Sequence, residues 1–173
     1  MRAMMLRSHT TVRIRAPRAE DAAELAGVFR DSWQLAYTGV IPGDQLDRIV
    51  LRRDEAWWRQ AVASSEQMLV LEVSGAVVGY ATYGTARTRG RFQGEIYELY
   101  LSPTHQGLGF GEHLFEACRH QLDERGLRGL VVWALIDNPV ACSFYWRRGG
   151  RPLASTVESF GKVKLEKAAF TWP

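Results

Sequence analysis

The chain has 173 residues, 46% of them apolar, which matches one ordinary domain with a sizeable hydrophobic core. No apolar run approaches the roughly 18 residues that span a bilayer, and the N-terminal MRAMMLRSHT lacks the apolar region of a signal peptide, so we expect a cytoplasmic protein that does not enter a membrane. The net charge of +3 comes from 22 basic residues scattered among 19 acidic ones, a pattern that suits an anionic ligand better than a nucleic acid.

The first half of the chain predicts a strand, two helices and a hairpin. TVRIRAP alternates apolar and basic residues, as a half-buried strand does. Apolar residues then follow helical spacing over 18–37, and RRDEAWWRQAVAS predicts a second helix. MLVLEV and AVVGYATYG flank Ser74-Gly75, which predicts a β-hairpin.

GEIYELYL, over 94–101, is the clearest strand signal in the sequence. Strict alternation would place Ile96, Glu98 and Tyr100 on one face and the intervening residues, Glu95 among them, on the other. An amphipathic helix that ends at Gly126 follows, and then GLVVWALI, which has the composition of a buried strand. This order predicts two parallel strands joined by a right-handed crossover.

The last quarter predicts a short helix and two strands. Asn138 has the residue type of a helix N-cap, with Pro139 at the first helical position, and Gly149-Gly150 ends the helix. RPLAS and KVKLEKAAFTW then read as strands. We expect a single domain over 12–173 and a flexible N-terminal extension over 1–11.

Three glycines, Gly107, Gly109 and Gly111, alternate in the turn between the 94–101 strand and the next helix. The free N–H groups and dipole of a helix N-terminus attract anions, so a phosphate is the natural ligand. The GxGxxG and P-loop patterns both fail, because Glu112 and Leu114 occupy the positions where glycines would be needed and the P-loop lysine is missing. The turn therefore predicts a pyrophosphate site without Mg²⁺; the alternative is that the glycines only shape a tight turn.

Two motifs make a specific resemblance. QGLGFG, over 106–111, resembles the Q/R-x-x-G-x-G/A acetyl-CoA loop of the GCN5-related N-acetyltransferase (GNAT) family. NPVACSFYWRRGG resembles the family's Asn-x-x-Ala-x-x-x-Tyr-x-x-x-Gly helix, and SWQLAYTGVIP is similar to one bacterial branch. The resemblance implies an α/β fold over nearly the whole chain: a mixed, mostly antiparallel sheet with two splayed parallel central strands, flanked by about four helices.

The chain departs from the family pattern at two places. Gly150 stands where phenylalanine is usual, which predicts looser packing between helix and strand. Gly107-Leu108 stand where a basic residue is common, which leaves pyrophosphate binding more to backbone amides.

The resemblance implies an acetyl-CoA site. Backbone of the 94–101 strand would pair with the pantetheine arm, and an N–H near Leu99 or Tyr100 would face the thioester oxygen. Asn138 is a polar partner for the pantetheine on this interpretation, although its N-cap role explains it equally well. The implied acetyl-CoA contacts are Leu99, Tyr100, Leu101, Gln106, Gly107, Leu108, Gly109, Phe110, Gly111, Glu112, Asn138 and Ser143.

The resemblance also implies two catalytic residues. Glu95 lies eleven residues before Gln106, where family members with a glutamate base carry it. Glu98 is the rival, expected on the opposite sheet face, and a plain ion-paired strand carboxylate is the structural alternative for either. Tyr145 fits the family's general acid, against the alternative of a buried helix tyrosine.

The implied reaction transfers an acetyl group from acetyl-CoA to a primary amine of a small molecule or peptide, by direct attack in a ternary complex. Trp33 and Tyr37 are the expected acceptor contacts, and the arginines of TARTRGRFQ are expected in a solvated loop. His113 and His120 lack HExxH spacing, so we expect no metal. The alternative function is a non-catalytic acyl-CoA-binding regulatory module, and a homodimer stays open.

Overall fold

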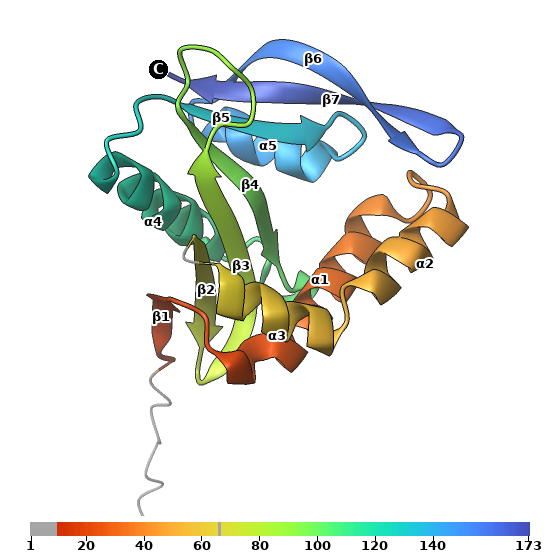
Figure 1. The fold of residues 1–173 in the computed structure, drawn as a ribbon, viewed down its shortest axis with the longest axis vertical. Coiled ribbons are helices and arrows are strands. Elements are labelled where there is room, and N and C mark those ends of the chain that lie inside the picture. Colours follow the sequence, from red (N-terminus) through yellow and green to blue (C-terminus); the bar gives the residue numbers. More distant parts are fainter. Residues whose placement is uncertain (1–9, 66) are drawn as a thin grey trace, which may run out of the picture.

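The structure, a computed structural model, describes residues 10–65 and 67–173, so positions 1–9 of the expected extension lie outside the described residues. Seven strands form one sheet in the order β1-β2-β3-β4-β5-β7-β6, with β4 and β5 parallel and every other neighbouring pair antiparallel. Helices pack on both faces (Figure 1). This confirms the predicted α/β fold with a mixed sheet. No helix in the described ranges is long and apolar enough to cross a membrane.

The elements follow one another with short connections. The strands are β1 (Val12–Arg15), β2 (Met68–Val73), β3 (Ala76–Thr85), β4 (Gly94–Leu101), β5 (Leu130–Leu135), β6 (Arg151–Phe160) and β7 (Val163–Trp172). The helices are α1 (Ala22–Tyr37), α2 (Gly43–Arg52), α3 (Glu55–Ser64), α4 (Phe110–Glu124) and α5 (Pro139–Arg147), with 3-10 turns at Ala19–Asp21 and Pro103–His105. The predicted hairpin, the crossover and the Asn138 N-cap are all confirmed.

Three helices precede the first hairpin, where the sequence predicts two. The additional helix, α2, starts directly after Pro42, and its apolar residues Leu46, Ile49 and Val50 follow helical spacing. The third helix begins only at Glu55, because the Asp54 side chain accepts a hydrogen bond from the Trp57 backbone N–H at 2.9 Å. The described chain thus has five α-helices, of which α2 packs against α1, while α1, α3, α4 and α5 flank the sheet, in agreement with the expected four.

The two faces of the sheet carry different helices. We call the side covered by α1 and α3 the α1 face, where Phe29, Trp58 and Tyr80 pack together. We call the opposite side, covered by α4 and α5, the α4 face, where Phe115 and Tyr145 join the core. The helix following each strand of the crossover thus buries its apolar stripe against the sheet.

The central strands β4 and β5 separate soon after they meet. Within the described chain their parallel pairing is limited to Gly94 with Leu130 and Glu95 with Val131. Beyond this point β2, β3 and β4 follow the long axis of the molecule, whereas β5, β7 and β6 run across its top (Figure 1). The rest of β4 therefore has an edge that no strand on the β5 side covers. We call the space between the diverging strands the strand gap.

A β-bulge at Tyr97 interrupts β4. The register against β3 shows it: Thr82 pairs with Glu98, and the next β3 residue, Tyr83, pairs with Ile96. Tyr97 is thus an extra residue in β4, and such an insertion shifts the period-two alternation of side chains by one.

The bulge changes which side chains share a face. Ile96 packs with Leu101 in the core of the α4 face. Glu95 pairs with Gly84 and lies on the α1 face, as Glu98 does. The expectation that Glu95 and Glu98 point to opposite faces is therefore wrong, because strict alternation holds only in an uninterrupted strand.

Gly150 is a close-packing position rather than a loose one. A Cβ at this residue would lie 2.5 Å from the Trp172 indole, whose Nε1 donates to the Arg148 carbonyl at 2.8 Å. The tryptophan from the last strand fills the space that a phenylalanine at position 150 would take. The prediction of looser helix–strand packing is wrong, since the ring comes from elsewhere in the chain.

Candidate functional site

The glycine turn joins the end of β4 to the start of α4. Gly109 is the N-cap of α4 with φ of 87°, a left-handed conformation that glycine adopts without steric cost. Among residues 10–65 and 67–173 no side chain caps the helix, so its first N–H groups have no side-chain partner there and could receive a ligand. Gln106 secures the turn, because its Nε2 donates to the Leu101 carbonyl at 3.0 Å.

The glycines differ in what surrounds them. A Cβ added at Gly107 or Gly109 would meet nothing within 4 Å, so the space above both is open. A Cβ at Gly111 would come within 3.0 Å of the Phe144 ring of α5, so this glycine serves helix packing. Two of the glycines therefore border open space at the start of α4, and the third packs against the core.

The side chains around the turn are mostly exposed. Leu108 points to solvent, and Phe110 is half-buried beside the His105 ring, with the ring centroids 6.1 Å apart. Glu112, in the first turn of α4, forms an ion pair with Arg148, with 3.3 Å between the carboxylate oxygen and the guanidinium nitrogen. The guanidinium of Arg148 lies 3.8 Å from the Phe144 ring centroid, which places a cation close to the turn.

The free edge of β4 presents backbone groups to the strand gap. Ser102 donates to the Val78 carbonyl of β3 at 2.7 Å, and in an antiparallel pair every second residue repeats this direction. Tyr100 therefore bonds toward β3, whereas Leu99 and Leu101 direct their backbone groups away from it, into the gap. An extended ligand arm can pair with this edge as a peptide does with a sheet edge.

Glu95 lies where β4 and β5 begin to separate. Its side chain is only 1% exposed and accepts three hydrogen bonds, all from Arg87: 2.8 Å from the backbone N–H, and 3.2 and 2.7 Å from the guanidinium. The Arg87 side chain is 65% exposed and lies 4.5 Å from the Tyr97 ring centroid. Arg87 is thus not simply part of a solvated loop, as the sequence suggests; it is the cover of a buried carboxylate.

Glu98 has a different partner on the same face. The guanidinium of Arg53 donates to both carboxylate oxygens, at 2.7 and 3.0 Å. The same guanidinium lies 4.6 Å from the ring centroids of both Phe29 and Trp57. Aromatic packing on the guanidinium and two hydrogen bonds hold this pair in one geometry, and the Arg53 side chain is 27% exposed, against 65% for Arg87 beside Glu95.

Tyr145 lies on α5 among aromatic residues of the α4 face and is 6% exposed. Burial raises the pKa of its hydroxyl, and the nearby Tyr37 raises it further. Within the described chain no hydrogen bond is made by this hydroxyl, which therefore stays protonated and available as a donor. These properties suit a general acid.

The remaining predicted contacts have varied surroundings. Asn138 accepts the Ala141 backbone N–H at 3.2 Å, as an N-cap should, and its Nδ2 donates to the Tyr37 hydroxyl at 3.4 Å. Ser143 is exposed and accepts a hydrogen bond from Arg147 at 2.9 Å. Trp33 is half-buried on the α1 face, where its ring packs against Tyr37 with centroids 4.8 Å apart.

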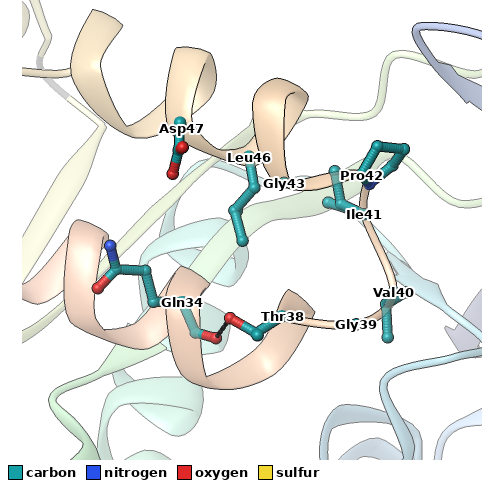
Figure 2. A pocket seen from close by; sticks show the side chains of 9 residues that line it. All are labelled: Gln34, Thr38, Gly39, Val40, Ile41, Pro42, Gly43, Leu46 and Asp47. Carbon is teal, nitrogen blue, oxygen red and sulfur yellow. Dashed lines mark hydrogen bonds between the residues drawn. The ribbon is translucent and has the colours of Figure 1, made fainter.

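A hollow of about 560 Å³ opens between the end of α1 and the start of α2 (Figure 2). Leu46 and Ile41 form its apolar floor, while Gln34 and Asp47 carry its polar groups. Ile41 and Leu46 also pack in one cluster with Tyr37, and no residue of the glycine turn lines this hollow.

Sequence reasoning missed three members of this region: Arg87, Arg53 and the hydroxyl of Tyr100. The arginines lie in connecting segments, where no periodic pattern identifies a partner. One signal for Arg87 was available: the 94–101 strand contains no basic residue that could pair with Glu95, so a cation from a connecting segment had to do so if Glu95 was buried. Tyr100 was expected only through its backbone, yet its hydroxyl contacts that of Tyr37 at 2.9 Å.

Comparisons with known proteins find relatives that match most of the chain. A model of the acetyltransferase (GNAT) family matches residues 28–149. The uncharacterized N-acetyltransferase YuaI of Bacillus subtilis is 27% identical over 163 residues, 94% of this chain and 93% of that protein. The L-amino acid N-acyltransferase MnaT of Escherichia coli is 31% identical over 120 residues, 69% of this chain and 67% of that protein.

A solved structure has a similar fold. The PaiA N-acetyltransferase of Thermoplasma acidophilum, crystallised with coenzyme A, superposes with a TM-score of 0.72 at 18% identity, covering 91% of this chain and 98% of that one.

Proposed function

The chain belongs to the GNAT family of acetyltransferases, and on this premise we propose that it transfers an acetyl group from acetyl-CoA to a primary amine. One observation carries the proposal: the parallel pairing of β4 and β5 stops after Glu95, and the open edge of β4 leads directly into the uncapped N-terminus of α4. This arrangement offers a slot for a thioester arm and an anion site for a pyrophosphate. The coenzyme A bound to the PaiA enzyme supports the choice of cosubstrate.

The backbone supplies the acetyl-CoA contacts in this proposal. The amides of Gly107 through Glu112 hold the pyrophosphate, and the gap-facing groups of Leu99 and Leu101 pair with the pantetheine. The N–H of Leu99 is the oxyanion donor, because alternation directs it into the gap while that of Tyr100 bonds toward β3. Asn138 and Ser143 line the other side.

Two side chains handle protons. Deprotonating an amine of pKa about 10.4 costs about 4.6 kcal/mol at pH 7, so a base is useful, and Glu95 is our candidate once Arg87 withdraws. Tyr145 donates a proton to the departing thiolate. Because burial raises its pKa, the Tyr145 hydroxyl keeps its proton at pH 7 and can donate a hydrogen bond to the sulfur as negative charge develops there.

We expect Tyr145→Phe to lower kcat about tenfold to a hundredfold with little change in KM for acetyl-CoA. Because burial raises the pKa of Tyr145, its neutral form persists above the usual tyrosine pKa of about 10, so kcat of the parent should not fall as pH approaches that value. The measurement is kcat against pH for both proteins. If kcat of the parent declines with an apparent pKa near 8, and the same decline is seen in Tyr145→Phe, Tyr145 is not the general acid.

The acceptor approaches from the α1 face in our proposal, with Trp33 and Tyr37 as its aromatic wall and the hollow beside α2 receiving its distal part. Gln34→Trp, which narrows the hollow, should raise acceptor KM about tenfold and leave acetyl-CoA KM unchanged. Gln60→Trp is the matched control, since Gln60 is also exposed on a helix but lies on α3. If both variants have the same acceptor KM, the hollow is not part of the acceptor site.

The function itself is tested in two steps. A thermal-shift panel of acetyl-CoA, coenzyme A, ATP and NAD comes first; a ligand at 100 times its Kd stabilises the fold by about 2.7 kcal/mol, and we expect a shift with the first two only. Thiol release is then measured over α-amino acids, polyamines, aminoglycosides and peptides, starting with the amino acids because of the similarity to MnaT. Tight acetyl-CoA binding without turnover on any acceptor would favour the non-catalytic acyl-CoA-binding module.

A further inference from the structure

Tyr37, the last residue of α1, connects the two walls of the strand gap. Its hydroxyl lies 2.9 Å from the hydroxyl of Tyr100 on β4 and accepts a hydrogen bond from Asn138 Nδ2 at 3.4 Å. Asn138 follows β5 and starts α5. Three residues from three separate elements thus form one hydrogen-bonded chain, which we call the gap bridge.

The gap bridge lies where the backbone does not join these walls. The parallel pairing between the strands stops at Glu95, well before Tyr100. The Tyr37 ring fills the opening from the α1 face, where it packs in one cluster with Leu135 at the end of β5 and with Tyr100. Side chains therefore take over the connection that backbone hydrogen bonds provide elsewhere in the sheet.

The bridge has a fixed position. Tyr37 is 5% exposed and Asn138 9% exposed, and the Trp33 ring lies within 5.8 Å of the Tyr100 ring, centroid to centroid. Burial raises the pKa of both tyrosine hydroxyls, so both remain neutral hydrogen-bonding groups. A buried hydroxyl pair of this kind specifies one arrangement, because displacing either member leaves the other without its partner.

The two walls carry different parts of the proposed machinery. The β4 wall holds the Leu99 amide, and the α5 wall holds Tyr145. Catalysis requires both at their working distances from one thioester, and displacement by about 1 Å can cost about a hundredfold in rate. A device that sets the spacing of the walls therefore bears on kcat without touching the reacting atoms.

We propose that Tyr37 is a positioning residue of the transfer reaction, whose hydroxyl ties β4 to α5 and sets the width of the strand gap. This inference rests on the proposed acetyltransferase function. The proposed contact with the acceptor uses the ring of Tyr37, whereas the positioning role uses its hydroxyl.

The test uses Tyr37→Phe, Tyr100→Phe and the double variant, because phenylalanine keeps each ring and removes only the hydroxyl. Each single variant should lower kcat about tenfold, whereas the Kd for coenzyme A should change less than about twofold, since the glycine turn is untouched. The double variant should be no slower than the slower single variant, because both changes remove the same bond. Tyr83→Phe is the control: it removes a partly buried hydroxyl that faces Gln121 of α4, away from the strand gap.

A second readout does not depend on turnover. Amide hydrogen exchange at 98–102 and 137–141 should accelerate in Tyr37→Phe and not in Tyr83→Phe. Unchanged exchange, unchanged kcat in Tyr37→Phe, or losses that multiply in the double variant would each overturn the inference. If the parent protein turns over no acceptor, the proposed function fails and the positioning role fails with it. If the parent is active and Tyr37→Phe has the same kcat, only the positioning role is contradicted.

Discussion

Gly109→Val is expected to raise the Kd for acetyl-CoA about tenfold to a hundredfold, a loss of about 1.4 to 2.8 kcal/mol of binding free energy. The space above Gly109 is open, with nothing within 4 Å of an added Cβ, so a valine side chain would occupy the place where the pyrophosphate must approach the amides. Calorimetry with acetyl-CoA measures the change directly, and KM for the acceptor should stay the same.

Strain complicates this experiment, because valine at a φ of 87° costs roughly 1–3 kcal/mol of stability. Gly126→Val supplies the matched control. Gly126 follows the other end of the same helix, has a φ of 71° and likewise meets nothing within 4 Å of an added Cβ. Both variants should melt earlier by similar amounts, but only Gly109→Val should lose acetyl-CoA. If a folded Gly109→Val protein binds as tightly as Gly126→Val, the glycines merely shape the turn.

Glu95→Gln should lower kcat about a hundredfold to a thousandfold while the Kd for acetyl-CoA stays unchanged. The side chain is almost fully buried at the start of the strand gap, and Arg87, its partner, is largely exposed. A guanidinium in that position can leave as the acceptor amine arrives, which frees the carboxylate to take a proton. Single-turnover rates with the best acceptor from the panel provide the measurement.

Two further variants separate a base from a structural ion pair. Arg87→Met uncovers Glu95 and should reduce stability while retaining most of kcat if Glu95 is the base. Glu98→Gln makes the same chemical change on the same sheet face, at a carboxylate that Arg53 holds with two hydrogen bonds, and should leave kcat within about threefold. If Glu95→Gln lowers the melting temperature without lowering kcat, the Glu95–Arg87 ion pair is purely structural. If kcat is lost in Glu98→Gln instead, Glu98 is the general base.

Elements with a strong local pattern could be predicted from the sequence. The hairpin around Ser74-Gly75, the strand–glycine turn–helix unit and the Asn138 cap depend on neighbouring residues, whose spacing the sequence states directly. The helix α2 follows the same periodicity, yet it is short and comes immediately after Pro42-Gly43, which also reads as a loop. Its boundary depends on packing against α1 more than on local propensity.

Contacts between segments that are far apart in the chain could not be predicted from the sequence. The bulge at Tyr97 exists only in the register between β3 and β4, and it moves Glu95 to the face of Glu98. The cover that Arg87 provides for Glu95 depends on how the connection between these strands folds back. Trp172 fills the space over Gly150 from the far end of the chain.

The family, the order of most elements and the position of the glycine turn follow from the sequence alone, because motif spacing and periodicity are properties of neighbouring residues. Which side chains meet in the strand gap depends on the three-dimensional fold. Tyr37, Tyr100 and Asn138 are far apart in sequence, and each has a sufficient local explanation as a helix, strand or cap residue. Their hydrogen-bonded chain arises because the strands diverge, and that divergence depends on twist and packing across the whole sheet, which no local pattern encodes.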